Sequence, residues 1–386
     1  MSWREAYKKF WPKMPPRSLE MTLPGLLIST CSNFASYDED QEPKIEPTTA
    51  IPVSRLPPRW GKEQVEDGLH FVMIGDIGGM QDYPYTTREQ LQTARALTSL
   101  TATFRLDFIA ELGDNFYHNG VSHVDDSRFQ DTFERVYDAE SLRGVPWYIT
   151  AGNHDWDGNV YAQIEYSQYS ERWNYPALYY SKRFPIPNTD GAALRLIMVD
   201  TMIICGNIDH SELDAPPMGP TEKSGSLRQL RWLENEFSFP QDPPASRNSR
   251  RSSLVIKAAD RTGHYPVWSV GSHGPTDCLV EMIKPMLETY NVTAYFGAHD
   301  HSLQHIHEDN STVEYFVSGA GHNIDPSTYF SSTISADWQR FHFGDGRSQG
   351  GFAYVSATAQ NMTVTFTDSV DMYDLYETTL GPRYGY

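Results

Sequence analysis

The chain has few cysteines, little positive charge and no long apolar run, and each shortage excludes a class of function. Its 386 residues include three cysteines, so a thiolate-rich metal site is not expected. No segment approaches the roughly eighteen apolar residues of a membrane-spanning helix, so membrane anchoring is not expected. The formal net charge of −19 disfavours nucleic acid as a partner. An anionic phosphate ester would therefore need local attraction from metal cations.

The three cysteines are unevenly placed. Cys205 and Cys278 lie within the region that carries the chemical motifs described below, whereas Cys31 lies outside it. One pair and one outlier fit a single disulfide formed in an oxidising compartment. Three free, buried thiols are the alternative.

The N-terminal region has a weak secretory signal with an over-long charged stretch. A basic start precedes a short apolar stretch at 23–28, so we interpret 1–36 as a signal or targeting segment. Residues 37–68 are rich in Pro, Glu and Asp without periodicity, which indicates an extended linker or pro-segment. Three acceptor sequons, at Asn291, Asn310 and Asn361, are compatible with a secreted glycoprotein. We expect the secretory pathway, with an extracellular, lysosomal or vacuole-like destination.

A repeating pattern begins at Leu69 and predicts one α/β catalytic domain over 69–386. Apolar runs at 70–74, 108–112 and 146–150 each end in a glycine, with helical spacing at 89–100 and 129–137 between them. Strand, loop and helix in alternation predict a largely parallel sheet. Further predicted strands are 194–200, 254–258, 293–296, 313–317, 351–355 and 362–366; predicted helices are 230–237 and 279–290, with an exposed loop within 203–230.

Five segments place oxygen or imidazole ligands just after a glycine. They are Gly-Asp-Ile-Gly-Gly (75–79), Gly-Asp-Asn-Phe-Tyr (113–117), Gly-Asn-His-Asp (152–155), Gly-His-Tyr-Pro (263–266) and Gly-Ala-His-Asp-His (297–301). Such hard oxygen donors and imidazoles suit iron, zinc or manganese. Sites in α/β sheets form beyond the carboxyl ends of strands, where these segments fall. The sequence therefore predicts a dinuclear metallohydrolase that acts on phosphate esters.

These segments resemble the purple acid phosphatases of the calcineurin-like metallophosphoesterase superfamily, and most closely their small, tartrate-resistant type. The resemblance runs from about Leu69 to Pro382 and includes His-Gly-Pro-Thr (273–276), Ser-Gly-Ala-Gly (318–321) and Gly-Gly-Phe-Ala-Tyr-Val (350–355). Tyr117 is diagnostic, because purple acid phosphatases use a tyrosine there to bind ferric iron, which gives their colour. The resemblance implies a four-layer α/β/β/α sandwich built from two packed mixed sheets.

The resemblance also implies the residues of the site. An Fe(III) ion would be held by Asp76, Asp114, Tyr117 and His301, and a divalent Fe, Zn or Mn ion by Asp114, Asn153, His264 and His299. A metal-bound hydroxide would attack the phosphorus of a small phosphomonoester or phosphoprotein. His154 and His273 would approach the phosphate, and one of them would protonate the departing alkoxide. We expect a monomer.

Other positions either match or depart from this family pattern. Cys205 and Cys278 match its single disulfide, and the loop 206–228 matches a segment that covers the active site and is activated by cleavage; an ordinary surface loop is the alternative. Ala298 replaces a glycine and Ser272 replaces an acidic residue. Residues 260–262 intervene between the predicted strand and Gly263, so either the strand shifts or the loop bulges.

Two other functions remain open on this scaffold. One is a phosphodiesterase or nucleotide hydrolase. The other is a catalytically silent scaffold protein. Scaffold relatives tend to lose metal ligands, whereas every ligand position of this chain is filled, which favours catalysis.

Overall fold

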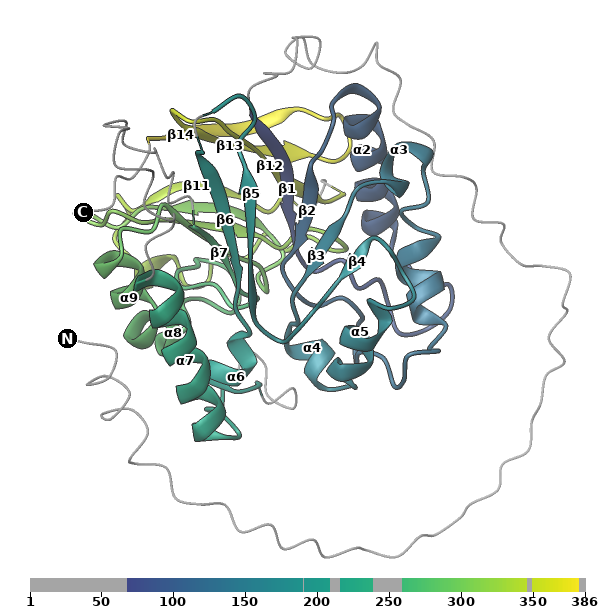
Figure 1. Cartoon of the computed structure of the whole chain (residues 1–386), viewed down its shortest axis with the longest axis horizontal. Coiled ribbons are helices and arrows are strands. Elements are labelled where there is room, and N and C mark those ends of the chain that lie inside the picture. The colour runs from purple at the N-terminus through teal and green to yellow at the C-terminus, as the bar shows by residue number, and fades with distance from the viewer. Residues whose placement is uncertain (1–67, 190, 209–215, 239–258, 346–348, 382–386) are drawn as a thin grey trace, which may run out of the picture.

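The structure, a computed structural model, describes residues 68–189, 191–208, 216–238, 259–345 and 349–381. Two seven-stranded sheets stack face to face, and helices cover their outer faces (Figure 1). Both sheets mix parallel and antiparallel pairs. The predicted four-layer α/β/β/α sandwich is confirmed. The predicted segments 1–36 and 37–68 lie outside the described residues, apart from Gly68.

The first sheet has the order β14-β13-β12-β1-β2-β3-β4. The strands β1, β2, β3 and β4 are parallel, and β12–β14 add antiparallel neighbours on the other side of β1. Their bounds are Leu69–Ile74 (β1), Phe108–Glu111 (β2), Trp147–Ile149 (β3), Trp173–Asn174 (β4), Gly351–Ala357 (β12), Met362–Asp368 (β13) and Asp374–Leu380 (β14).

The second sheet has the order β11-β9-β10-β8-β7-β6-β5. Strands β10, β8, β7 and β6 are parallel, whereas β5, β9 and β11 pair antiparallel to their neighbours. Their bounds are Tyr180–Pro185 (β5), Ala193–Met198 (β6), Ala259–Thr262 (β7), Ala294–Gly297 (β8), Leu303–Ile306 (β9), Glu314–Ser318 (β10) and Gln339–Phe343 (β11).

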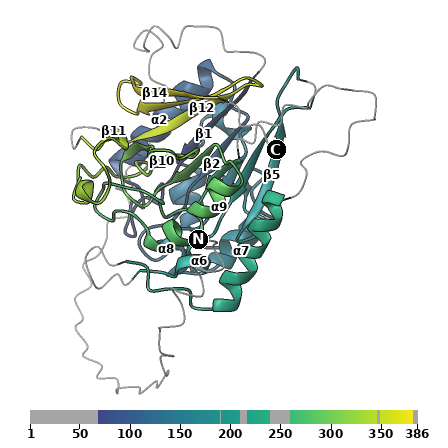
Figure 2. The same cartoon turned by 90° about the vertical axis from the view of Figure 1, so that its left-hand side faces the viewer.

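Helices pack on the outer face of each sheet. The first sheet is covered by α2 (Arg88–Thr103), η4 (Phe129–Glu134), α3 (Glu140–Arg143), α4 (Asn153–Trp156) and α5 (Val160–Tyr166). The second carries α6 (Thr201–Cys205), α7 (Lys223–Ser238), α8 (Asp277–Met282) and α9 (Lys284–Thr289), which Figure 2 shows gathered on one side. The short helix η5 covers Ser331–Thr333. None of the helices in the described ranges is long and apolar enough to cross a membrane.

Strand β1 shows why both faces of the first sheet are apolar. Phe71 and Met73 belong to the core between the two sheets, whereas Val72 and Ile74 belong to the core beneath α2. Successive side chains of a strand point to opposite faces, so a strand between two layers must be apolar throughout. This requirement explains the uninterrupted apolar run that precedes Gly75.

Three predictions about local structure need correction or lie outside the described residues. Helix α7 begins at Lys223, so the exposed loop predicted up to residue 230 ends earlier than expected. The predicted strand 254–258 lies outside the described residues. The structure instead places strand β7 at Ala259–Thr262, where it pairs with β6 and β8, so the intervening residues are themselves strand and do not bulge.

The disulfide is present as the resemblance implied. Cys205 at the end of α6 is bonded to Cys278 in α8, with their Cα atoms 5.7 Å apart. A bond across 73 residues restricts the unfolded chain strongly and stabilises the fold by roughly 4 kcal/mol in the chain-entropy description.

Candidate metal centre

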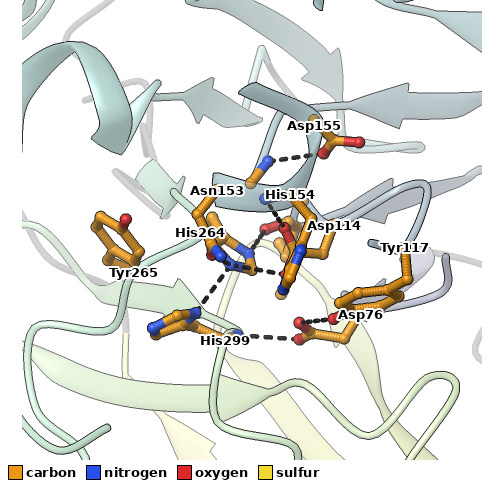
Figure 3. A network of polar contacts seen from close by, with 12 residues as sticks. Asp76, Asp114, Tyr117, Asn153, His154, Asp155, His264, Tyr265 and His299 are labelled. Carbon is orange, nitrogen blue, oxygen red and sulfur yellow. Dashed lines mark hydrogen bonds and ion pairs between the residues drawn. The ribbon is translucent and has the colours of Figure 1, made fainter. Parts of the chain in front are cut away.

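The seven predicted metal ligands all follow strand ends that meet at one edge of the two sheets. Asp76, Asp114 and Asn153 come shortly after β1, β2 and β3 of the first sheet. His264 follows β7, and His299 and His301 follow β8, both in the second sheet. Figure 3 shows the side chains from the two sheets facing one another around Asp114.

The histidine cluster, which we define as Asn153, His264 and His299, is tightly grouped. His264 Nε2 lies 2.7 Å from Asn153 Oδ1 and 3.2 Å from His299 Nδ1. The same nitrogen is 3.3 Å from Asp114 Oδ2. All three residues of the cluster are buried. Four potential ligand atoms therefore surround one point.

The tyrosine cluster, which we define as Asp76, Tyr117 and His301, forms the other side of the centre. The Tyr117 hydroxyl donates to Asp76 Oδ1 at 2.7 Å and lies 3.1 Å from His301 Nε2. The backbone N–H of His299 donates to Asp76 Oδ2 at 3.0 Å, which ties the two clusters together. The structure thus brings together all seven residues that the sequence nominated.

The backbone explains why glycines precede these residues. A Cβ atom at Gly152 would lie 2.1 Å from Asp114 Oδ1, so only glycine lets the third strand end approach the second. Asp76, Asp114 and His299 have positive φ angles of 58°, 60° and 72°, in the left-handed region that non-glycine residues rarely occupy. Such conformations cost of order 1–3 kcal/mol each and concentrate at functional sites.

His154 lies beside the centre. Its backbone N–H donates to Asp114 Oδ1 at 3.0 Å, and its ring centroid lies 4.7 Å from that of Tyr117. Its Nδ1 is 2.6 Å from the carbonyl oxygen of His118, which leaves Nε2 on the side of Asp114, 4.0 Å from Oδ2. The side chain is 19% exposed, so solvent and a substrate can reach it.

His273 lies on the histidine cluster, with its ring centroid 4.0 Å from that of His299. Both its Nδ1 and its backbone N–H contact Asp300 Oδ1, at 3.0 and 2.8 Å. Phe330 packs against Gly274, where a Cβ atom would meet its ring. The ring of His273 is therefore positioned by Asp300 and His299, and 30% of its side chain is exposed.

Two residues that the sequence interpretation overlooked contact the tyrosine cluster. The buried His322 ring stacks on Tyr117 with centroids 4.0 Å apart, and its Nδ1 is 2.7 Å from the Asp76 carbonyl oxygen. Asn323 Nδ2 lies 3.3 Å from His301 Nδ1. Every member of the tyrosine cluster therefore contacts the pair His322–Asn323. In the sequence, the pair could have been nominated because it directly follows Ser-Gly-Ala-Gly (318–321).

Asp155 and Asp300 were overlooked as well, although both lie inside the nominated segments. Asp155 accepts hydrogen bonds from the backbone N–H groups of Gly152 and Asn115, at 2.8 and 3.1 Å, and so joins two of the ligand loops. Burial, followed by the charge of Asp114, raises the pKa of Asp155 to about 6. Asp300 holds His273, and although burial opposes ionisation, hydrogen bonds from His273 and Ser269 lower its pKa.

The pKa shifts at the centre reflect crowded, buried groups. Burial alone would lower the pKa of His264, but the neighbouring Asp114 carboxylate raises it to about 9. Burial and the adjacent His273 and His264 lower the pKa of His299 well below its usual range. One imidazole thus retains a proton while its neighbour stays neutral. A cation bound between them would replace that proton as the partner of Asp114.

The donor set fits metal ions. Within the described ranges, one group of acidic, histidine or cysteine side chains has its ligand atoms within 4.8 Å of one another. This group consists of Asp114, His264 and His299. Asn153 Oδ1 points at this group, while its Nδ2 is buried with no hydrogen-bond partner among the described residues. Carboxylate, amide and imidazole donors together suit a borderline divalent metal.

Comparison with known families assigns the fold and the site to one group. The family model of the calcineurin-like phosphoesterases matches residues 69–303. The chain belongs to the calcineurin-like phosphoesterase family. The matched range contains all seven predicted ligands, together with His154 and His273. Membership in this phosphoesterase family and the group around Asp114 together indicate a dinuclear metal centre.

Individual similar proteins point to a narrower group within this family. It is 42% identical to the human tartrate-resistant acid phosphatase type 5, over 82% of this chain and 91% of that protein. Among solved structures, it is similar to GAP50, the anchor in the inner membrane complex of Plasmodium, with a TM-score of 0.66, 19% identity, and 83% and 90% of the two chains covered. A purple acid phosphatase from yellow lupin has a TM-score of 0.54 at 15% identity, covering 82% and 54%. The two structural likenesses concern the fold alone.

Proposed function

We propose that this phosphoesterase is an acid phosphatase that hydrolyses phosphate monoesters at a dinuclear metal centre. The observation that carries the proposal is the convergence of seven side chains from five strand ends around Asp114. Its 42% identity to a tartrate-resistant acid phosphatase over most of both chains supports the same function. The substrate class is a small phosphomonoester or a phosphoprotein.

The two clusters would hold different metals. The tyrosine cluster and Asp114 would hold Fe(III), and the histidine cluster and Asp114 would hold Fe(II), Zn(II) or Mn(II). Burial, followed by the charges of Asp114 and Asp76, raises the pKa of Tyr117 well above its usual range. A bound cation would displace this proton, and the hard, anionic carboxylate and phenolate donors favour a trivalent ion beside Tyr117. Neutral amide and imidazole donors suit a more exchangeable divalent ion.

The bound metals would supply Lewis acidity and activate water for an in-line attack on phosphorus. The chain itself would bind and orient the phosphate and move one proton. His154 and His273 are the partly exposed imidazoles beside the centre, and in each the Nδ1 atom already has a partner, His118 O or Asp300. These two imidazoles would contact phosphate oxygens, and one of them would protonate the leaving group.

The other predicted segments of the chain fit a secreted phosphatase. Residues 69–386 would form the catalytic domain, preceded by a targeting segment at 1–36 and a linker or pro-segment at 37–68. The bond between Cys205 and Cys278 supports an oxidising compartment, and therefore a secreted, lysosomal or vacuole-like enzyme. The segment 206–222, which precedes α7, would regulate access to the site if a protease cleaves it. The enzyme would act as a monomer.

Metal analysis and an activity screen on the same purified chain test the proposal. We expect about two metals per chain, a visible absorption band and faster hydrolysis of monoesters than of diesters, with an acidic optimum. Removal of the metals with a chelator should abolish turnover, and adding iron with zinc should restore it. Preference for diesters would favour a phosphodiesterase. A colourless, metal-free and inactive protein would instead favour a scaffold role.

A further inference from the structure

A cavity lies beside the candidate metal centre, where the helices of the two sheets meet. It has a volume of about 460 Å³, within the range of about 300–1,000 Å³ that is typical of small-molecule sites. Its walls come from α4 and α5 on the first sheet and from α6 and α7 on the second. Figure 1 shows these four helices at the same end of the molecule.

The cavity has flat, apolar walls. Trp156, Tyr161 and Tyr179 supply aromatic rings, and Leu178, Met202 and Ile203 supply aliphatic surface. The indole N–H of Trp156 donates to Asp200 Oδ2 at 3.0 Å, which fixes the orientation of the ring. Gly225 of α7 adds no side chain to the cavity, which leaves room for a ligand there. Aromatic walls favour a flat aromatic occupant through stacked and edge-to-face contacts.

The polar groups of the cavity carry no net charge. Glu222 and Arg228 pair with each other at 3.4 Å, and their side chains are 70% and 61% exposed. None of the seven predicted ligands lines the cavity, and neither do His154 and His273. The phosphate that undergoes hydrolysis would therefore bind elsewhere. With a net charge of −19 on the whole chain, an anionic ligand is disfavoured here.

We propose that this cavity is a second ligand site, distinct from the metal centre, for a neutral aromatic molecule of one or two rings. The exposed Thr221 supplies a hydroxyl for a polar substituent of that molecule, and Asn207 Oδ1, which accepts from Ile208 N, has a second lone pair for a donor. Asn207 Nδ2 also donates to the carbonyl oxygen of Asn153 at 3.2 Å and to Asp157 Oδ1 at 2.9 Å. The aromatic site and the metal centre therefore share helix α4.

The test uses 2-naphthol as the probe and the full chain as the protein. Saturation-transfer NMR should show saturable binding with a Kd of about 0.1–1 mM, as expected for a ligand with so few atoms. Gly225→Leu fills the cavity from a position where a Cβ atom makes ordinary contacts of 3.5 and 3.6 Å, and should weaken binding at least about tenfold. Tyr161→Ala, which removes a wall, should weaken it about threefold.

Gly144→Leu is the matched control. A Cβ atom at Gly144 meets nothing within 4 Å, and this exposed residue follows α3, away from the cavity. This variant should bind the probe as the parent does, and thermal unfolding should show that all variants fold. Unsaturable binding to the parent, or equal binding by Gly225→Leu, overturns the proposal.

Inorganic phosphate distinguishes the two sites. Added orthophosphate should leave the probe bound, because the phosphate site lies at the metal centre. Displacement of the probe by orthophosphate overturns the proposal of a distinct site. These measurements need no turnover, so an inactive protein that binds 2-naphthol would refute the phosphatase function and leave the aromatic site standing.

Discussion

The histidine cluster of the candidate metal centre lies deep in the protein, whereas the tyrosine cluster reaches toward solvent. Asn153 and His264 are fully buried, while 20% of the His301 side chain is exposed. The histidine cluster offers neutral donors, and the tyrosine cluster offers a carboxylate and a phenol. Within the tyrosine cluster it is His301 that reaches solvent, whereas Asp76 and Tyr117 are buried. Burial of charged donors costs more than burial of neutral ones, so these two depend on their hydrogen bonds and on a bound cation rather than on water.

The clusters also differ in what holds them. The tyrosine cluster is contacted by the pair His322–Asn323, which follows β10 of the second sheet. The histidine cluster is held through α4, which Asn207 connects to α6 and the disulfide. Asp114 contacts His264 of the histidine cluster and also raises the pKa of Tyr117 in the tyrosine cluster. We therefore predict that both metals depend on Asp114, and that the contacts supporting one cluster can be removed without affecting the other cluster.

Asp114→Asn should have the largest effect, because it removes the charge that both metals would share. We expect loss of both metals and a fall in kcat of at least about 10³-fold, beyond the 10–100-fold typical of residues that merely support ligands. Metal analysis and phosphomonoester turnover measure these losses. Asp371→Asn, at an exposed turn between β13 and β14, is the control and should retain two metals. Retention of both metals by Asp114→Asn would break the idea of a shared ligand.

Tyr117→Phe and His264→Ala should separate the two clusters. Tyr117→Phe should remove the visible band and leave a folded protein, because the phenolate is the proposed chromophore. His264→Ala should keep the band but lose the divalent metal, with a fall in activity of at least about 10²-fold. Absorption spectra and metal content report these changes. If His264→Ala also loses its colour, the clusters are not separable.

His154→Ala should lower kcat by about 10²–10⁴-fold for poor leaving groups, if His154 is the main proton donor. The loss should be much smaller for nitrophenyl phosphate, whose leaving group needs no proton. Metal content should change little, because His154 is not a predicted ligand. Comparison of alkyl and nitrophenyl esters measures the difference. Equal losses would make His154 a phosphate-binding residue and would transfer the acid role to His273.

Asp200→Asn tests the support beneath the histidine cluster. Asp200 caps α6 by accepting from Ile203 N, and burial raises its pKa to about 7. The native state therefore binds a proton that the unfolded chain releases near pH 4, so stability falls as pH rises from about 4 to 7. Asparagine caps helices equally well. In the parent, the free energy of unfolding should therefore be up to about 4 kcal/mol lower at pH 7.5 than at pH 4.5 because of Asp200, and the variant should lack this difference. Urea unfolding at the two pH values measures it.

For Asp200→Asn, an unchanged slope of stability against pH would show that other buried acids set it. Glu111, whose pKa is raised well above its usual range by burial and then by Asp155, is the first to examine.

His322→Phe should have the smallest effect. Phenylalanine keeps the stacking on Tyr117 but loses the hydrogen bond to the Asp76 carbonyl oxygen. We expect a shifted visible band, a changed iron midpoint potential, and a fall in activity of about tenfold or less. His307→Phe is a control histidine at the far end of β9, and it should leave the spectrum unchanged. An identical spectrum in His322→Phe would mean that the pair does not tune the tyrosine cluster.

The sequence predicted the nominated side chains because each follows a glycine at a strand end. That signal is local: the apolar run marks the strand, and the glycine marks the tight approach, as at Gly152. His322 also follows a glycine after a strand, β10, but nothing in its local sequence shows which residue it contacts. It lies 246 residues from Asp76 in the chain, and only the folded sheets bring the two together. Asp300 was visible in the sequence, but its bonds to His273 span 27 residues and cannot be inferred from spacing.

The prediction of secondary structure failed where polar residues form strands or helices. The sequence Ala-Asp-Arg-Thr (259–262) has no apolar run, yet it forms β7 because β6 and β8 pair with it on both sides. Helix α7 begins with Lys-Ser-Gly-Ser, a sequence that favours a loop in isolation. Its buried Leu230, Leu233 and Phe237 anchor the later turns on the second sheet and extend the helix backward.

The left-handed backbone at Asp76, Asp114 and His299 has a consequence for the evolution of this protein. Glycine would relax all three positions, so selection for thermal stability alone would drive these residues toward glycine. Each such step would relieve the local backbone strain and remove a donor from the site. Lineages released from the need for catalysis should therefore accumulate glycine at these positions early. An active descendant must instead recover its stability at a distance, in the cores between and outside the sheets.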